Sequence, residues 1–131
     1  RGGLEFRRVL FRSELMDKIT ILEIKKIKIS DAAKQIIINK ELESLKKTYQ
    51  TCLTPTPELI EQIAKLKAIN LKLWDIEEGK RECERQKNFG DTFVNLARSV
   101  YIENDHRAKI KAEINRLTNS NISEVKSYKA Y

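Results

Sequence analysis

The sequence predicts an all-α fold: an antiparallel bundle of about four helices, in which the third and fourth form a long hairpin. Three observations support this prediction. The 131 residues include only four glycines and two prolines, whereas the helix-favouring residues Lys, Glu, Leu and Ile are abundant. Apolar residues recur every three or four positions over long stretches, as on one face of a helix. The connections between these stretches are short, which places neighbouring helices antiparallel.

Two helices are predicted in the first part of the chain. The segment 14–29, ELMDKITILEIKKIKI, has one apolar face, but its isoleucines also partly alternate, which leaves a strand as the alternative. Ser30 and Asp31 then interrupt the pattern and supply an N-cap for a helix over 32–52. The faces expected to be buried consist of Leu15, Ile19 and Leu22 in the first helix and Ile38, Leu42, Leu45 and Tyr49 in the second.

A third and longer helix is predicted over 57–88. The preceding TPTP stretch ends the second helix, and Thr56 is suited to cap the third. Pro57 fits the first helical position, where its missing N–H is not needed. The stripe expected to be buried consists of Leu59, Ile63, Leu66, Ile69, Leu73 and Ile76.

The fourth helix is predicted over 92–118, with Gly90 as the stop of the preceding helix and Asp91 as the N-cap. Its apolar positions are Phe93, Leu96, Val100, Ile110, Ile114 and Leu117. The two long helices then make a hairpin of roughly 40 Å. The remaining tail, 119–131, is expected to be a loop with a turn of helix.

The opening thirteen residues, RGGLEFRRVLFRS, allow three interpretations. Arginines interleaved with phenylalanines are suited to phosphates and bases, and the stretch also has the composition of an arginine-rich presequence. However, residues 4–13 are a translation of CTGGAGTTCAGACGTGTGCTCTTCCGATCT, the sequence of a common short-read sequencing adapter. We interpret residues 1–13 as an artefact outside the fold, and predict one helical domain over 14–131 that is truncated at its N-terminus.

Charge and composition restrict the classes of function. Without residues 1–13, Lys+Arg falls from 26 to 22 and Asp+Glu from 19 to 18, so the net charge drops from +7 to +4. Both signs are mixed along the chain, which argues against nucleic-acid binding. No apolar stretch is long enough to insert into a membrane. The sequence has one histidine and no glycine-rich phosphate loop, so we expect no metal, no cofactor and no catalytic constellation.

The two cysteines are expected to remain reduced. A helix that starts near Pro57 places Cys83 about 39 Å along its axis, far from Cys52. A disulfide needs Cα atoms only about 4.4–6.8 Å apart. Free thiols fit a cytoplasmic protein.

Polar residues interrupt the apolar stripes of both long helices. In an antiparallel hairpin that turns near residue 90, positions whose numbers sum to about 180 face each other. This register brings together Glu77 with Glu103 and Asn104, Arg81 with Arg98, and Trp74 with His106 and Arg107. We favour a structural salt-bridge layer, in which Glu77 or Glu103 is the partner of Arg107.

The alternative to a structural layer is a pocket for an anion or a sugar. Its candidate residues are Trp74 or Tyr101 as a stacking face, Arg81, Arg98 and Arg107 as donors, and Glu77 and Asn104 beside them. A small anionic ligand is the partner that this interpretation implies.

Four stretches resemble a family of small bacterial and phage proteins classed as a domain of unknown function: ELMDKITILEIK, LWDIE, FVNLARSVYIENDHRAKIKAEIN and EVKSYKAY. Members carry a short segment ending in glycine before EL, where this chain has Ser13. The resemblance implies a mostly helical fold and a loose link to surface-polysaccharide glycosyltransferases. The family-motif positions are Asp17, Lys18, Glu23, Lys25, Trp74, Glu77, Arg98, Tyr101, Asn104, Asp105, Arg107, Lys126 and Tyr128.

Together these features predict a non-enzymatic accessory module that uses its amphipathic, coiled-coil-like helices to bind a protein partner or a second copy of itself. The alternative is a small enzyme or binding domain that holds an anionic or sugar metabolite in an arginine-lined pocket between helices.

Overall fold

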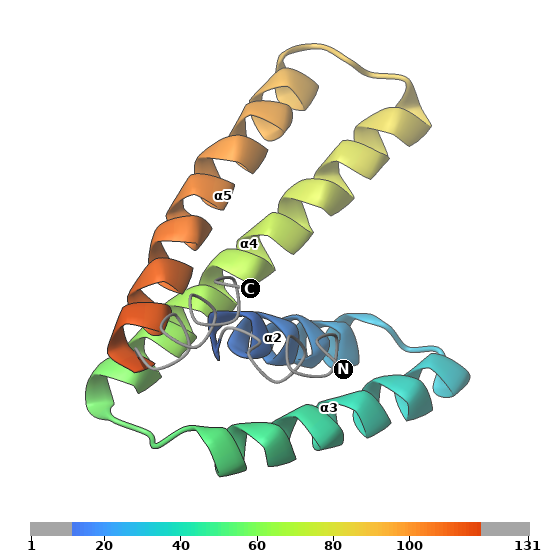
Figure 1. The fold of residues 1–131 in the computed structure, drawn as a ribbon. Helices are drawn as coiled ribbons and strands as arrows, with labels where there is room; N and C mark the ends of the chain where they lie inside the picture. Colours follow the sequence, from blue (N-terminus) through green and yellow to red (C-terminus); the bar gives the residue numbers. More distant parts are fainter. Residues whose placement is uncertain (1–11, 119–131) are drawn as a thin grey trace, which may run out of the picture.

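The computed structural model describes residues 12–118, which form four helices and no strand (Figure 1). They are α2 (Arg12–Lys28), α3 (Ala32–Cys52), α4 (Pro57–Gln86) and α5 (Asp91–Thr118). The predicted all-α bundle with a long hairpin is therefore confirmed, and the strand alternative for residues 14–29 is wrong. The predicted loop at 119–131 lies outside the described residues, as do residues 1–11.

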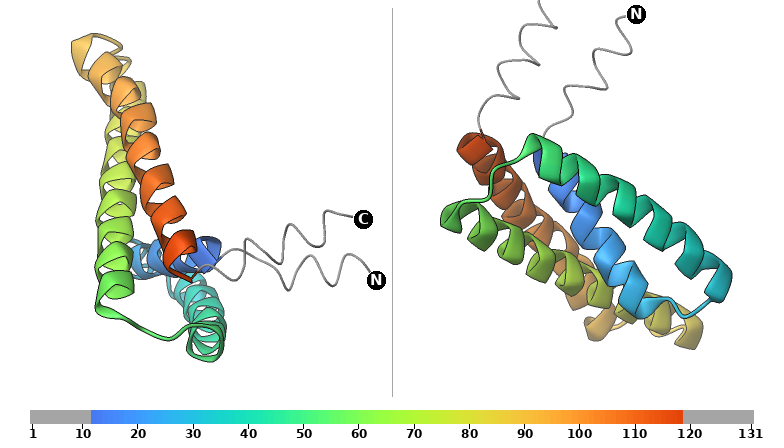
Figure 2. Two further views of the ribbon diagram at one scale, coloured as in Figure 1. Left: turned by 60° about the vertical axis from the view of Figure 1, so that its left-hand side comes forward. Right: turned by 90° about the horizontal axis from the view of Figure 1, so that it is seen from below.

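The hairpin of α4 and α5 is the longest part of the molecule. We call the end where α4 begins and α5 ends its base, and the turn between the two helices its tip. The shorter helices α2 and α3 lie together at the base, and the tip projects beyond them (Figures 1 and 2). α2 packs against α3 and against both helices of the hairpin, and is the element that joins them.

Helix α2 begins at Arg12, two residues before the predicted start. Ser13 is buried, and its N–H donates a hydrogen bond to the Asn115 side chain on α5 (3.2 Å). The predicted face, Leu15, Ile19 and Leu22, is buried.

The predicted caps of the next two helices are confirmed. The Asp31 carboxylate accepts from the Lys34 N–H at the start of α3 (2.9 Å). The Thr56 hydroxyl accepts from the Leu59 N–H, and Pro57 is the first residue of α4. Each cap satisfies a backbone donor that has no partner within its helix.

The tip of the hairpin differs from the prediction. α4 ends at Gln86, where the helix is closed by Lys87 in the left-handed conformation (φ 56°), and Gly90 is not the stop. Asp91 belongs to the first turn of α5. Gly90, directly before it, takes the N-cap position, where its carbonyl accepts a hydrogen bond from the Val94 N–H. The earlier end of α4 moves the centre of the turn toward the N-terminus.

This shift changes which residues of the hairpin face each other. The Lys72 ammonium lies 2.9 Å from the Glu103 carboxylate, and a Cβ built on Gly79 would lie 3.0 Å from the Leu96 side chain. The numbers in each pair add to 175 rather than 180. The absence of a side chain at Gly79 lets α5 come close to α4 at this level.

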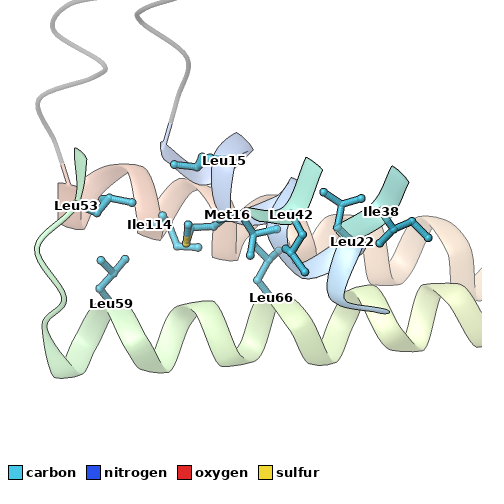
Figure 3. Close-up of a cluster of buried hydrophobic side chains, with 10 residues drawn as sticks. Leu15, Met16, Leu22, Ile38, Leu42, Leu53, Leu59, Leu66 and Ile114 are labelled. Carbon is cyan, nitrogen blue, oxygen red and sulfur yellow. The ribbon is translucent and has the colours of Figure 1, made fainter. Parts of the chain in front are cut away.

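The hydrophobic core lies at the base (Figure 3). Leu66 of α4 and Ile114 of α5 are 0% exposed at its centre, and α2 and α3 close it from the other side. Its buried members are Leu15, Met16, Ile19, Leu22, Ile38, Leu42, Leu53, Leu59, Leu66 and Ile114. Toward the tip, the hairpin buries Ile76 and Cys83.

Both cysteines are free, as predicted, with Cys52 exposed and Cys83 buried. None of the helices over 12–118 is both long enough and apolar enough to cross a membrane.

Candidate functional site

A buried polar network joins α2 to both helices of the hairpin. The Arg107 guanidinium on α5 makes two hydrogen bonds to the Asp17 carboxylate on α2, one of them from Nε to Oδ1 at 3.1 Å. The Asn70 amide on α4 donates to Asp17 Oδ1 and to the Thr20 hydroxyl, both at 2.9 Å. That hydroxyl donates in turn to the Asp17 carbonyl (2.9 Å).

The network is well satisfied. Asp17, Thr20 and Asn70 are buried, and the Arg107 side chain is 26% exposed. Every buried side-chain nitrogen and oxygen in the described part of the chain has a hydrogen-bond partner. The two hydrogen bonds between the Arg107 guanidinium and the Asp17 carboxylate, together with the one from the Asn70 amide, fix the angle at which α2 crosses the hairpin. Of the residues predicted for the polar layer, Arg107 alone belongs to this network, which it forms with Asp17, Asn70 and Thr20.

The predicted partner of Arg107 was wrong. Neither Glu77 nor Glu103 forms an ion pair with it, and its partner is Asp17, which comes from a different helix. Glu77 instead pairs with Lys80 on its own helix (3.4 Å). The predicted register considers the hairpin alone, whereas the charge that compensates Arg107 comes from α2.

Glu103 forms a second buried charge between α4 and α5. Its carboxylate lies 2.9 Å from the Lys72 ammonium and 3.4 Å from the His106 ring. The hydrogen bond from Lys72, helped by that from His106, lowers the pKa of Glu103 below its ordinary value, against the opposing effect of burial. The Glu103 carboxylate is therefore held in its charged form between α4 and α5.

A cavity of about 310 Å³ lies next to the polar network, where α2 crosses the hairpin. It contains four of the predicted site residues: Trp74, Glu77, Arg81 and Arg107. Its other lining residues are Ile21, Asn70, Leu73 and Glu78. The other three candidates, Arg98, Tyr101 and Asn104, do not line it and are exposed on α5.

The charges in this cavity are largely compensated. Arg107 is held by Asp17, and Arg81 lies 3.4 Å from Glu78. Glu77 adds a further carboxylate. The lining thus presents acceptors and donors in similar numbers around the indole of Trp74, which differs from the cationic pocket that three free arginines would form.

A separate group of predicted residues lies on the outer face of α5. Arg98, Tyr101 and Asp105 are exposed there, with Tyr101 57% exposed, and Val94 follows the same stripe. Arg98 forms no ion pair within residues 12–118. Positions 94, 98, 101 and 105 repeat at four-three-four spacing, so they share one face of α5. That face is about half a turn away from Leu96 and Glu103, which face α4.

The remaining family-motif positions are dispersed. Glu23 bridges α3 and α4 through Lys46 (3.5 Å) and Lys67 (3.2 Å), whereas Lys18 is exposed on α2. Lys25 is half-buried near the end of α2. Lys126 and Tyr128 lie outside the described residues.

Sequence reasoning missed Asn70 and Thr20. Both are polar residues within apolar stretches of their helices, and Asp17 and Thr20 are one turn apart on the face that carries Met16 and Ile19. A carboxylate on such a face was the signal for a buried partner, because isolated charges are rarely buried.

The sequence model of the family described as "Family of unknown function (DUF6165)" matches residues 7–131. The chain belongs to this family. The DUF6165 match covers all four helices and extends through 119–131, and it begins inside the adapter-like stretch at residue 7. No curated protein and no solved structure matches the chain. In the described part of this DUF6165 protein, no group of three His, Cys, Asp or Glu residues is placed to hold a metal ion.

Proposed function

We propose that this protein is a non-enzymatic helical module that binds another protein helix along the outer face of α5, and that a second copy of itself is the first such partner. The observation that carries this proposal is the exposed stripe of Val94, Arg98, Tyr101 and Asp105. A four-three-four repeat with apolar and aromatic members is the seam that a partner helix fits.

The charges of the stripe favour a second copy in antiparallel orientation. Centred between Tyr101 and the neighbouring Ile102, a two-fold axis sets Arg98 of each copy opposite Asp105 of the other. The same contact therefore forms twice, as in an isologous dimer. Tyr101 is 57% and Ile102 41% exposed, so the centre of the seam has apolar surface to bury.

The link to surface polysaccharides rests on the resemblance of the four sequence stretches. We propose that the module serves enzymes that build such polysaccharides, as an accessory that brings helical partners together. The buried polar network supports a structural rather than catalytic role for Arg107, because its charge is already compensated.

Charge exchange tests the self-association. Multi-angle light scattering over a range of concentrations should show a dimer for the parent chain and a shift toward monomer for Arg98→Asp and for Asp105→Arg. The double variant should restore the dimer, because the pair is re-formed with reversed signs. Lys40→Asp and Glu41→Arg, which make the same charge changes on the exposed face of α3, are the controls. A parent chain that stays monomeric at every concentration would refute self-association.

A second candidate function is sugar binding in the 310 Å³ cavity. The observation that favours it is the combination of the Trp74 ring with carboxylates and donors in one hollow. A sugar offers an apolar C–H face that packs on an indole, and hydroxyls that both donate to carboxylates and accept from Arg or Asn. The compensated charges fit a neutral or weakly acidic sugar better than a strong anion.

Intrinsic fluorescence reports directly on this cavity, because Trp74 is the only tryptophan in the chain. Titration with a neutral hexose or a hexuronate should give a saturable change, which Glu77→Gln weakens and the exposed control Glu84→Gln leaves intact. Inorganic phosphate should give none. Saturation by phosphate with no response to either sugar would favour an anion site, and no response to any of them would exclude this second function.

A further inference from the structure

A second exposed apolar surface lies at the corner where α2 ends and α3 begins. Ile27, Ile36 and Ile37 are 76%, 70% and 65% exposed, more than any other large apolar side chain in the described part of the chain. The Gln35 amide on α3 donates a hydrogen bond to the Lys26 carbonyl on α2 (2.8 Å), which links the two helices at this corner. Figure 1 shows the corner at an outer edge of the molecule.

The isoleucines of α3 are exposed because this helix packs chiefly against α2. Only two of its 21 residues are buried, Ile38 among them. Ile36 lies about half a turn from Ile38, so it points away from α2. Lys40 follows Ile36 and Ile37 by one helical turn and is also exposed. The outward surface of α3 therefore begins with two isoleucines and a lysine.

The same corner carries the net charge of the described chain. Residues 25–40 contain five lysines and one carboxylate, that of Asp31, so their net charge is +4. The other residues of 12–118 contain as many acidic as basic side chains, and their charges cancel. Lys28 pairs with a carboxylate on α4 (3.6 Å). The lysines that form no ion pair within residues 12–118 are Lys25, Lys26, Lys34 and Lys40.

The composition of the corner favours a lipid surface over other partners. Interfaces between proteins are depleted of lysine and enriched in aromatic residues, Met and Arg. Surfaces that bind nucleic acids rely on arginine and on aromatic rings that stack on bases. Residues 25–40 contain no Arg, no Met and no aromatic residue. Exposed aliphatic side chains beside lysines are typical of segments that lie on an anionic bilayer.

We propose that the corner of α2 and α3 binds the surface of a lipid bilayer that contains anionic lipids. Ile27, Ile36 and Ile37 enter the headgroup layer, and the lysines around them contact the anionic headgroups. α3 then lies on the bilayer surface, and no described helix crosses it. The proposal concerns a different surface from the α5 stripe and does not depend on self-association.

Co-sedimentation of the full chain with vesicles tests this proposal. The parent should bind vesicles of equal parts phosphatidylcholine and phosphatidylglycerol, should bind much less to phosphatidylcholine alone, and should be released as NaCl is raised. Lys34→Glu combined with Lys40→Glu should weaken the binding about tenfold or more, because each lysine near an anionic surface strengthens it several-fold. Ile36→Gln combined with Ile37→Gln should weaken it by a similar factor, because apolar burial supplies the other part of the affinity.

Two matched double variants serve as controls. Lys18→Glu with Lys109→Glu makes the same charge change at exposed lysines elsewhere. Ile60→Gln with Leu71→Gln replaces exposed apolar side chains of α4. Both controls should bind nearly as well as the parent. All the substituted side chains are exposed, so an unchanged thermal midpoint verifies that each variant is folded.

Several results would overturn the proposal. The parent could bind neither kind of vesicle, or both equally. The isoleucine variant could bind as well as the parent, which would reduce the contact to charge attraction alone. Binding could be lost in Arg7→Glu with Arg8→Glu and kept in both α3 variants, which would assign it to the opening residues. Retention on immobilised polyuridylate without binding to vesicles would make the corner a nucleic-acid surface.

Discussion

The base and the tip of the hairpin are built from the same two helices but are held by different interactions. At the base, α2 packs against both helices of the hairpin, so Leu66 and Ile114 are completely buried. Asp17 of α2 forms an ion pair there with Arg107 of α5. At the tip, α4 and α5 have only each other. There Phe93, Leu96 and Val100 remain half-buried although they continue the same stripe.

This difference shows that periodicity specifies which face of a helix is buried but not how deeply. Burial depends on how many elements pack against the face, and at the base α2 adds a third helix to the contact between α4 and α5. The tip compensates in part by close approach, since Gly79 lets the Leu96 side chain contact the backbone of α4.

The largest effect is expected at the base, from Arg107→Leu. This change removes both hydrogen bonds from Arg107 to the buried Asp17 carboxylate and leaves Lys111, at 4.0 Å, as the only cation near it. It should lower the free energy of unfolding by about 3–5 kcal/mol. Urea denaturation followed by circular dichroism measures it. Adding Asp17→Asn should recover most of the loss, because an amide carries no charge and can still accept from Asn70. Arg85→Leu, at an exposed pair near the tip, should change little.

Cavity-creating substitutions compare the two ends directly. Leu66→Ala should cost about 4–5 kcal/mol, because its surroundings are closed on all sides and cannot collapse. Ile76→Ala lies toward the tip, where the two helices can move together, and should cost about 2–3 kcal/mol. Denaturation of both variants under the same conditions decides the order. Equal losses would mean that the tip is as rigidly packed as the base.

A smaller effect is expected from Gly79→Ala. Alanine favours the helix by up to about 1 kcal/mol, but its Cβ would lie 3.0 Å from a Leu96 methyl. Because the Leu96 side chain is half-buried and able to shift, we expect a net change of less than about 1 kcal/mol. Thermal unfolding measures this change. A loss above 2 kcal/mol would show that the tip is packed too tightly to adjust.

The smallest effect is a change in acid stability from Glu103→Gln. The pKa of Glu103 is lowered in the folded state, so its contribution is present above its ordinary value of 4.5 and is lost as the pH falls through the lowered value. The parent should therefore lose stability below about pH 4.5 more steeply than the variant. Thermal midpoints between pH 7 and pH 3 test this, and parallel curves would contradict it.

Much of this architecture follows from the sequence. The bounds of α3, the caps at Asp31 and Thr56 and the inward-facing side of each helix depend on local patterns, and they were predicted correctly, although several residues of the predicted stripes are only half-buried. The end of α4 at Gln86 was not, because the left-handed cap at Lys87 is formed by a lysine and no glycine marks it. That error of a few residues shifted the register of the whole hairpin.

The candidate site was predictable only in part. Trp74, Glu77, Arg81 and Arg107 do line one cavity, since they follow one level of the hairpin. Arg98 lies on the opposite side of α5, because nine residues separate it from Arg107 and nine residues make two and a half turns. The Asp17 contact depends on how α2 crosses the hairpin, which no local pattern specifies.

The Asp17–Arg107 pair also has a consequence for the order of folding. Its two residues are 90 positions apart, so the contact closes a loop that contains almost the entire domain. The α4–α5 hairpin forms across a short turn and has a low entropic cost, whereas α2 must find its place from a great distance along the chain. We expect the hairpin to form first and α2 to dock last. Removing the Asp17–Arg107 contact should then accelerate unfolding and leave the folding rate nearly unchanged.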